Sequence, residues 1–508
     1  MLMPLTALDK ACESMSILSF FVFELPPSLS LDERVHLVGQ VKDAAQRVAD
    51  KWKLLSGKPE WTKAGVWAIR IDETPDPTRP SVGFSSAGHS EPFHLAAGLS
   101  APLPPLSSAP TALFPSAPNL SLFRPAHLPT TLAAYAKQNA PFVHVHAALF
   151  SDSLAVGISF SHGVFDGEGA GFFNRALSAE LHGREWVVPP LPEDGKNPFV
   201  AKLEALEADE EVAAKARENP SPGFEESWAL MSVRGALRLV VDLLWEKVRW
   251  KNAPGQAFLS DEAVARLVSG VKEEVKRETA GREYVSTGDI LTGWILQSIH
   301  ADDVSSGDCV ISTAVYNSRE LLDKHFPDTP SLSTYSATCA VPYMHIAKPL
   351  PISTLLSTPL SALSLSFRRN LKQYRTLPAL SSLSKLIRGS SVLIPVRGLP
   401  QLPPFLRTLL MPWTLLPAWR KPHIHRYFFS NQLSLPLAEF SVPNPLGDEG
   451  KDDLPMTYFL QGATVPISPS HLVAFQKVQG GIAISGIMRK GHWEALGRGI
   501  EKLNVEVV

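Results

Sequence analysis

The stretch that decides the fold is LAVGISFSHGVFDGEGAG, residues Leu154–Gly171. Apolar residues recur at every second position up to the histidine, and then the chain becomes polar and rich in glycine. Together with VHVHAALF (Val143–Phe150) and the short SDS between the two runs, this stretch predicts a β-hairpin. Side chains on one face of a strand repeat every second residue, so His162 shares a face with the apolar residues at even positions. The pattern therefore places an imidazole at the tip of a buried strand.

A neutral imidazole at the end of an apolar strand can act as a base. Its pKa in solution is near 6.5, and burial disfavours the charged form, so the sequence predicts that His162 is neutral and accepts a proton. Gly163 and Gly167 allow a tight turn, and the small residues 169–171 leave room for a ligand. The alternative is a core histidine whose ring bonds only a backbone carbonyl.

Asp166 follows His162 by four residues and precedes a glycine. In a chain with 15 histidines, H-x-x-x-D is expected by chance about 0.6 times and H-x-x-x-D-G about 0.04 times, so the longer pattern is informative. Asp166 either orients the imidazole, as the carboxylate of a catalytic triad does, or anchors the turn through an ion pair with an arginine. We favour the anchor, because a side chain beyond this turn need not face the ring.

The composition predicts a soluble globular protein with more than one domain. The chain has 508 residues, 44% of them hydrophobic and 19% charged, which is too long for one core and too apolar for disorder. A net charge of −2 argues against a nucleic-acid partner. Three widely separated cysteines favour a reducing, cytoplasmic compartment. No signal peptide or membrane span is expected.

One apolar segment, LLMPWTLLPAW (Leu409–Trp419), has two interpretations. We favour a packed or substrate-lining segment, because the run is about half the ~20 residues that cross a bilayer and contains two prolines. A monotopic membrane contact is the alternative.

Helix and strand patterns alternate along the rest of the chain. Helices are predicted at residues 31–52, after Ser260, and after Ser286, where Asp289 completes a capping pattern. ILSFFVF (17–23), CVISTAVYN (309–317) and GGIAISGIM (480–488) are typical of strands. A proline-rich crossing is expected at 91–129, and a polar connection at 188–256 with its own helix at 227–248. The mixture predicts an α/β or α+β protein.

The residues around His162 resemble the BAHD superfamily of coenzyme A-dependent acyltransferases, whose hallmark is H-x-x-x-D-G. PLTALD resembles the opening of that family, with Asp9 at its usual acidic position, and STGDILTGWILQSI resembles the helix that opens its second half. NSRELLDKHFP carries Arg319, which the resemblance pairs with Asp166. The family's second motif, D-F-G-W-G, survives here only as Glu439-Phe440. This departure indicates a remote branch of the family, such as the acyltransferases of fungal specialised metabolism.

The resemblance implies an α/β fold of two similar mixed sheet-and-helix domains, like chloramphenicol acetyltransferase, with a channel between them. The expected boundaries are an N-terminal domain at 1–200, a crossing segment at 201–256 and a C-terminal domain at 257–508. Acyl-CoA is the implied co-substrate, with no permanently bound cofactor. His162 removes a proton from the hydroxyl or amine of a small acceptor and returns it to the departing thiolate. A monomer is expected.

Two further sets of site residues follow from the resemblance. Ser430 and Asn431 are candidate oxyanion donors, with turn capping as the alternative. SFRRNLKQYR supplies Arg368, Arg369, Lys372 and Arg375 for the coenzyme A phosphates, with a solvated helix face as the alternative.

Several other functions were weighed against an acyltransferase. His144 and His146 share a strand face but lack a third ligand, so no metal site is predicted. No G-x-S-x-G occurs, which argues against an α/β-hydrolase. A condensation-like domain shares the fold and the H-x-x-x-D-G but takes its acyl group from a carrier protein; such domains usually have two adjacent histidines, whereas Ser161 precedes His162 here. A non-enzymatic binding protein is the last alternative.

Overall fold

The computed structural model describes residues 1–508 except for two long segments, 219–251 and 390–422, and several short stretches: 7, 10–11, 64, 75, 77, 115–118, 193–194, 304–306, 448–451, 465–470 and 506–508. The helix predicted at 227–248 and the apolar segment 409–419 lie outside the described residues.

The predicted hairpin forms the centre of a five-stranded sheet. Its two strands pair antiparallel with Leu149 opposite Leu154, which confirms the prediction. The sheet order is β13 (Met456–Thr464), β2 (Ser16–Glu24), β8 (Ser153–Ser161), β7 (Val143–Leu149) and β5 (Gly83–Gly88).

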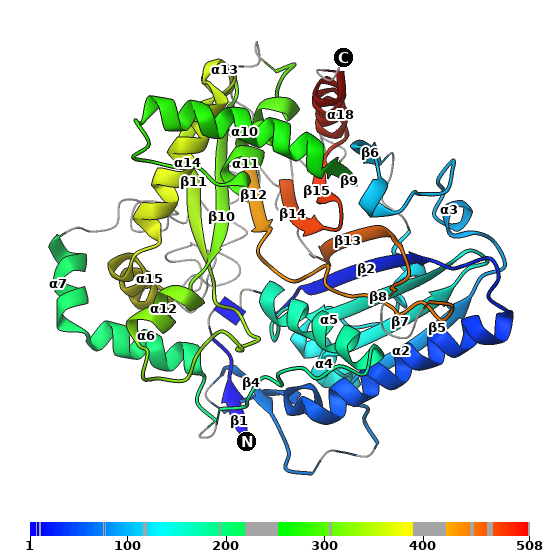
Figure 1. Cartoon of the computed structure of the whole chain (residues 1–508). Coiled ribbons are helices and arrows are strands. Elements are labelled where there is room, and N and C mark those ends of the chain that lie inside the picture. Colours follow the sequence, from blue (N-terminus) through cyan, green and yellow to red (C-terminus); the bar gives the residue numbers. More distant parts are fainter. Residues whose placement is uncertain are drawn as a thin grey trace, which may run out of the picture.

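Helices cover one face of this sheet and irregular chain covers the other (Figure 1). On the helical face lie α2 (Leu31–Lys51), α4 (Leu132–Gln138) and α5 (Gly167–Leu181), and their apolar side chains form one core with the even-numbered residues of β8. The opposite face packs Phe20 and Ala155 against Phe93 and Phe123. These two phenylalanines belong to the proline-rich stretch, which contains only short elements such as α3 (Phe93–Ala96) and β6 (Ala112–Phe114).

A mixed seven-stranded sheet forms the second core. Its order is β11 (Ala340–Pro351), β10 (Cys309–Asn317), β12 (Ile424–Gln432), β14 (His471–Val478), β15 (Gly481–Arg489), β9 (Asn252–Ser260) and β6. The helices around it in Figure 1 are α10 (Asp261–Glu278), α11 (Thr287–Ile299), α14 (Leu360–Tyr374) and α18 (Lys490–Val505). The predicted caps are confirmed: Ser260 caps α10, and Ser286 and Asp289 form a capping box at α11.

The two large sheets exchange strands. β13 comes from the last tenth of the chain but pairs with β2, and β6 comes from the first quarter but pairs with β9. Gln461 on β13 joins both sheets, because its side chain accepts a hydrogen bond from Ser19 (2.7 Å) and its carbonyl accepts one from Ser485 (2.7 Å). The sheets are therefore held together by backbone pairing as well as by side chains.

The remaining elements lie around the two large sheets. A small sheet is formed by β1 (Leu2–Pro4), β4 (Trp67–Arg70) and β3 (Lys58–Trp61), and the further helices are α6 (Pro198–Ala208), α7 (Glu210–Glu218), α12 (Arg319–His325), α13 (Ile352–Ser357) and α15 (Leu377–Gly389). Among the helices of the described residues, none combines the length and the apolar character that a membrane span requires.

Candidate active site

His162 is the first residue after β8, in the turn that leads to α5. Its backbone N–H bonds the carbonyl of Met15 (3.0 Å), and its side-chain Nδ1 lies 3.0 Å from the carbonyl oxygen of Phe165. A carbonyl oxygen can only accept, so Nδ1 must carry the hydrogen. In the neutral ring this leaves Nε2 as the nitrogen that accepts a proton. A core histidine would make the same bond to a backbone carbonyl. His162 differs from a core histidine because its side chain is only half-buried, and here the bond fixes the tautomer of the ring.

The pKa of His162 is higher than burial alone would make it. Burial lowers the pKa of the imidazole, but attraction and hydrogen bonding to the Cys12 side chain, with a smaller attraction from Asp166, raise the pKa to about 9. The prediction of a neutral ring considered burial alone and missed this neighbour. The Cys12 side chain therefore controls how readily His162 takes up a proton.

A short turn holds Cys12 against His162. The N–H of Cys12 bonds the carbonyl of Asp9 (3.0 Å), and the carbonyl of Cys12 accepts from the N–H of Met15 (3.0 Å). The carbonyl of Met15 then accepts from His162, so the turn is tied to the end of β8. A Cβ at Gly163 would lie 3.2 Å from the Cα of Glu13, which shows how closely the two backbones approach. Nothing in the sequence connects Cys12 with His162, because this contact depends on the pairing of β2 with β8.

Asp166 points away from this pair and has two structural tasks. Its Oδ1 accepts from the N–H groups of Glu168 and Gly169, both at 3.1 Å, and so caps α5. Its Oδ2 lies 2.8 Å from Nη2 of Arg319, and both side chains are only 5% exposed. The structure thus brings Asp166 and Arg319 together in the way that the anchor interpretation describes.

The other donors of Arg319 bind nearby acceptors: Nη1 donates to Oδ1 of Asn317 (3.2 Å), and Nε donates to the carbonyl of Tyr335 (3.2 Å). Nη2 also donates to the carbonyls of Tyr335 (2.8 Å) and Ala337 (2.9 Å). Burial lowers the pKa of Arg319, but the attraction of Asp166 outweighs it and the net pKa is raised. Asp9 holds the same loop from the other side, because its Oδ1 accepts from the N–H of Thr338 (2.9 Å). The loop 335–339 therefore connects the His162 turn with the second sheet.

Ser430 and Asn431 lie at the end of β12. Oγ of Ser430 accepts from the side chain of Gln432 (2.9 Å), and Oδ1 of Asn431 accepts from the N–H of Leu433 (3.2 Å), as in the turn-capping alternative. The amide nitrogen of Asn431 faces the first turn of α11, where a Cβ added to Gly288 would lie 1.9 Å from it. The chain then passes beside the start of α5, where a Cβ added to Gly167 would meet Leu435 at 2.6 Å. These contacts connect the end of β12 with both helix N-termini.

Three of the predicted phosphate-binding cations, Arg368, Arg369 and Lys372, lie on α14 beside the same end of α11, and Arg375 follows the last residue of that helix. Three of the four have acidic partners. Arg368 bonds Asp289 through Nε (2.8 Å), and Arg369 bonds Glu283 (3.0 Å). Arg375 bonds Glu320 (2.6 Å). Arg368 and Lys372 also lie over the ring of Tyr284, at 5.0 and 5.2 Å from its centre. A phosphate that binds these cations would have to compete with the carboxylates of Asp289, Glu283 and Glu320. The spacing of the cations in the sequence does not predict these carboxylates.

Two other sequence features have structural partners. Ser85 Oγ bridges His144 Nε2 and His146 Nδ1, both at 2.8 Å, which accounts for this strand pair without a ligand. Phe440, from the remnant of the second family motif, packs edge-on against Phe21 with ring centres 4.9 Å apart.

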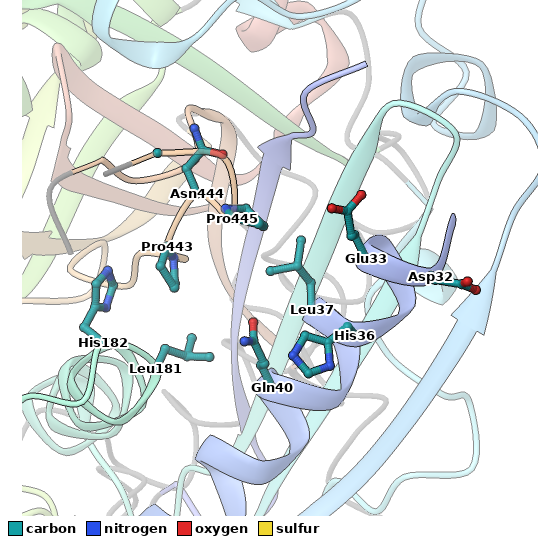
Figure 2. Close-up of a pocket in the computed structure, with 11 residues that line it drawn as sticks. Asp32, Glu33, His36, Leu37, Gln40, Leu181, His182, Pro443, Asn444 and Pro445 are labelled. Carbon is teal, nitrogen blue, oxygen red and sulfur yellow. The ribbon is translucent and has the colours of Figure 1, made fainter. Parts of the chain in front are cut away.

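Figure 2 shows a surface pocket, whose volume is about 430 Å³ and whose lining does not include His162. It is formed by the first turns of α2, the last turn of α5 and the loop 443–447. The 15 residues of α5 separate the pocket from Asp166 by roughly 22 Å, at 1.5 Å per residue. The pocket is therefore not the site that the His162 motif defines.

Comparison with known proteins finds fungal relatives that are named acetyltransferases. No protein-family model matches the chain. Acetyltransferase BOT5 of Botryotinia fuckeliana is 28% identical over 252 residues, which are 48% of this chain and 44% of that protein. Acetyltransferase pyiB of Pyricularia grisea is 23% identical over 414 residues, 78% of this chain and 75% of that protein. The chain spans about half the length of the first curated relatives that it matches.

Solved structures with the same fold include TRI101 of F. graminearum complexed with coenzyme A and T-2 mycotoxin. The TM-score is 0.62 at 12% identity, with 98% of this chain and 97% of that chain covered. The condensation domain of the Monacolin K polyketide synthase MokA is also similar, with a TM-score of 0.52 at 11% identity over 99% of this chain and 97% of that chain. The chain thus has a mixed α/β fold like that of TRI101. In sequence it is similar to fungal proteins named acetyltransferases.

Proposed function

We propose that this protein transfers an acyl group from acyl-CoA to a hydroxyl or amine of a small metabolite, with His162 as general base. The observation that carries the proposal is the fixed tautomer of His162: Nδ1–H is bonded to the Phe165 carbonyl, so Nε2 is the proton acceptor. The acetyltransferase relatives and the coenzyme A named with TRI101 support the choice of donor.

The proposed reaction uses one proton that leaves and returns. Nε2 of His162 takes the acceptor proton as the acceptor oxygen or nitrogen bonds to the thioester carbon. The carbon–sulfur bond then breaks, and the coenzyme A thiolate takes the proton back from the imidazolium. General base catalysis of this kind contributes about 10²–10⁴ in rate, and positioning both substrates contributes further.

Asp166 and Arg319 act in this proposal as positioning residues. The ion pair fixes the start of α5 and the loop 335–339, and the short turn between Ser161 and α5 carries His162. Asp9 supports the same loop through Thr338. The carboxylate thus keeps the histidine in place without taking part in the proton transfer.

The substrates would enter between the two large sheets, in the channel that the family resemblance implies. Asn431, at the end of β12, is exposed and near the start of α11, which suits an oxyanion donor. Arg368, Arg369 and Lys372 lie at the same end of α11, which suits the anionic part of coenzyme A if the phosphates displace the acidic partners.

A condensation-like domain that uses a carrier-protein donor is the second candidate, because the MokA condensation domain has the same fold. The sequence relatives named acetyltransferases favour acyl-CoA.

Thermal melting with acetyl-CoA, free coenzyme A and ATP tests the donor. A ligand at 100 times its dissociation constant adds about 2.7 kcal/mol to the stability of the folded state. We expect stabilisation by both coenzyme A species and not by ATP. No shift with acyl-CoA of several chain lengths would reject this donor and favour a carrier protein.

A further inference from the structure

A buried cluster of histidines lies at the far end of β12 from Ser430 and Asn431. His300, at the end of α11, His425, near the start of β12, and His492, at the start of α18, each offer a ring nitrogen, and these three atoms lie within 4.8 Å of one another. All three side chains are buried, with relative exposures of 0, 1 and 6%. Five residues of β12 separate His425 from Ser430, or roughly 17 Å at 3.3 Å per residue. The cluster is therefore separate from the candidate active site.

We propose that His300, His425 and His492 bind one divalent transition-metal ion of the Zn²⁺ type, which ties the ends of α11 and β12 to the start of α18. Three imidazoles from separate segments are a common ligand set for such ions. This departs from the expectation of no metal site, which considered only His144 and His146.

In two of the three histidines, one ring nitrogen contacts a carboxylate, which is the arrangement common among histidines that bind metal ions. Nδ1 of His300 lies 2.7 Å from a carboxylate oxygen of Asp303, and Nε2 of His425 lies 3.4 Å from one of Asp308. A carboxylate on one ring nitrogen turns the other nitrogen toward the metal and makes it a stronger ligand. In His425 that other nitrogen, Nδ1, is buried and has no hydrogen-bond partner among the residues that the structure describes. A buried nitrogen without a partner is costly, and a metal ion would satisfy it.

A fourth histidine lies beside the three but outside the group whose ring nitrogens lie within 4.8 Å of one another. His471, at the start of β14, is fully buried, and within the described part of the chain neither of its ring nitrogens has a hydrogen-bond partner. Its ring centre lies 5.0 Å from that of His492. Tyr427 lies between the rings, and its hydroxyl bonds His300 Nε2 (2.8 Å) and His492 Nδ1 (3.4 Å). That hydroxyl would have to give up these two nitrogens to the metal.

The protonation and charge of the cluster are compatible with a cation. Burial lowers the pKa of His300 and His492, and lowers that of His425 to about 4, so the imidazoles are in the neutral form that metals require. Asp303 and Asp308 supply two negative charges, against the one positive charge of Arg489 beside His423. A tetrahedral ion with Zn–N bonds of about 2.0–2.1 Å sets its ligand nitrogens about 3.4 Å apart, so the widest pair must approach by roughly 1.4 Å.

Titration of the chelator-treated full-length protein with Zn²⁺, followed by calorimetry and thermal melting, tests this site. We expect one ion per chain and a rise in melting temperature. His425→Gln and His492→Gln should weaken binding by more than the ~10–100-fold that loss of an outer carboxylate causes. The matched control is His345→Gln, because His345 is equally buried, bonds a tyrosine (Tyr343, 2.6 Å) and also has one ring nitrogen with no partner in the described residues. It should bind Zn²⁺ like the unchanged protein.

A second set of measurements applies if the ligand variants do not fold. Asp303→Asn and Asp308→Asn change groups at the edge of the cluster and should weaken binding by ~10–100-fold. Co²⁺ in the unchanged protein should give the intense visible absorption of a four-coordinate nitrogen site. No binding in the unchanged protein, or equal binding in the histidine or aspartate variants, would overturn the proposal and leave the cluster as a packed aromatic network.

Discussion

His162 and the His300 cluster use the same side chain in two opposite environments. His162 is half-buried at a chain turn, and Cys12 and Asp166 raise its pKa to about 9. The cluster is enclosed between helices and strands, where burial lowers the pKa of His425 to about 4. A histidine that meets an opposite charge at the edge of the core can exchange protons with a substrate. A histidine surrounded by other buried rings keeps its lone pairs, which suits a metal ion.

The largest expected effect comes from removing the ring at the proposed active site. His162→Ala should leave a folded protein whose turnover falls by at least ~10², because the general base is lost. Acyl transfer is measured with acetyl-CoA and a responsive acceptor, and circular dichroism checks the fold. His144→Ala, which removes a histidine bonded to Ser85, serves as the control. Near-normal turnover in His162→Ala would show that His162 is not the general base, and the functional contrast with the buried cluster would fail.

The next effect concerns the ion pair that positions His162. Asp166→Ala leaves the buried Arg319 without its carboxylate and should lower the free energy of unfolding by about 3–5 kcal/mol, with a loss of activity. Chemical denaturation measures the change. Glu262→Ala, which breaks the exposed pair with Arg266 within one helix, should cost only about 0.5 kcal/mol. Lost activity with unchanged stability would favour the orienting role of Asp166.

A smaller effect is expected on pH dependence. The Cys12 side chain raises the pKa of His162, so Cys12→Ala should lower that pKa and give the proton-accepting form at lower pH. The rising limb of kcat/KM against pH should therefore move to lower pH, whereas Cys309→Ala, on β10, should leave it unchanged. Superimposed profiles for Cys12→Ala and the unchanged protein would contradict the assigned role of Cys12.

The smallest effect is expected on the rate after treatment with a chelator. The proposed metal lies roughly 17 Å from Ser430 and no catalytic step uses it, so initial rates at low temperature should not change. Thermal inactivation should become faster in the same sample. An immediate loss of turnover on adding the chelator would instead connect the cluster with catalysis.

Local patterns in the sequence predicted the local structure well. The hairpin, the strand Cys309–Asn317 and the capping box at Ser286 were all predictable, because each depends on residues that are neighbours in the chain. The His162 motif was identified for the same reason. Family resemblance, not spacing, suggested the partner Arg319, which is 153 residues from Asp166.

Contacts between distant segments were not predictable. Cys12 reaches His162 only because β2 pairs with β8, and the histidine cluster combines three segments that no short motif joins. The cations on α14 were recognised, but Glu283, Asp289 and Glu320 come from other elements and alter what those cations can bind. In each case, contacts between segments that are distant in the sequence determine the pKa or the binding partners of the side chain.

The exchange of β13 has a consequence for folding during synthesis. β8 ends at residue 161 and β13 ends at residue 464. After β8 has been synthesised, about 300 more residues must therefore be added before β13 can pair with the second edge of β2. At 5–20 residues per second this is roughly 15–60 s, during which an apolar strand edge is open to other chains. We therefore expect the nascent protein to depend on chaperones, and fragments that end before residue 456 to aggregate.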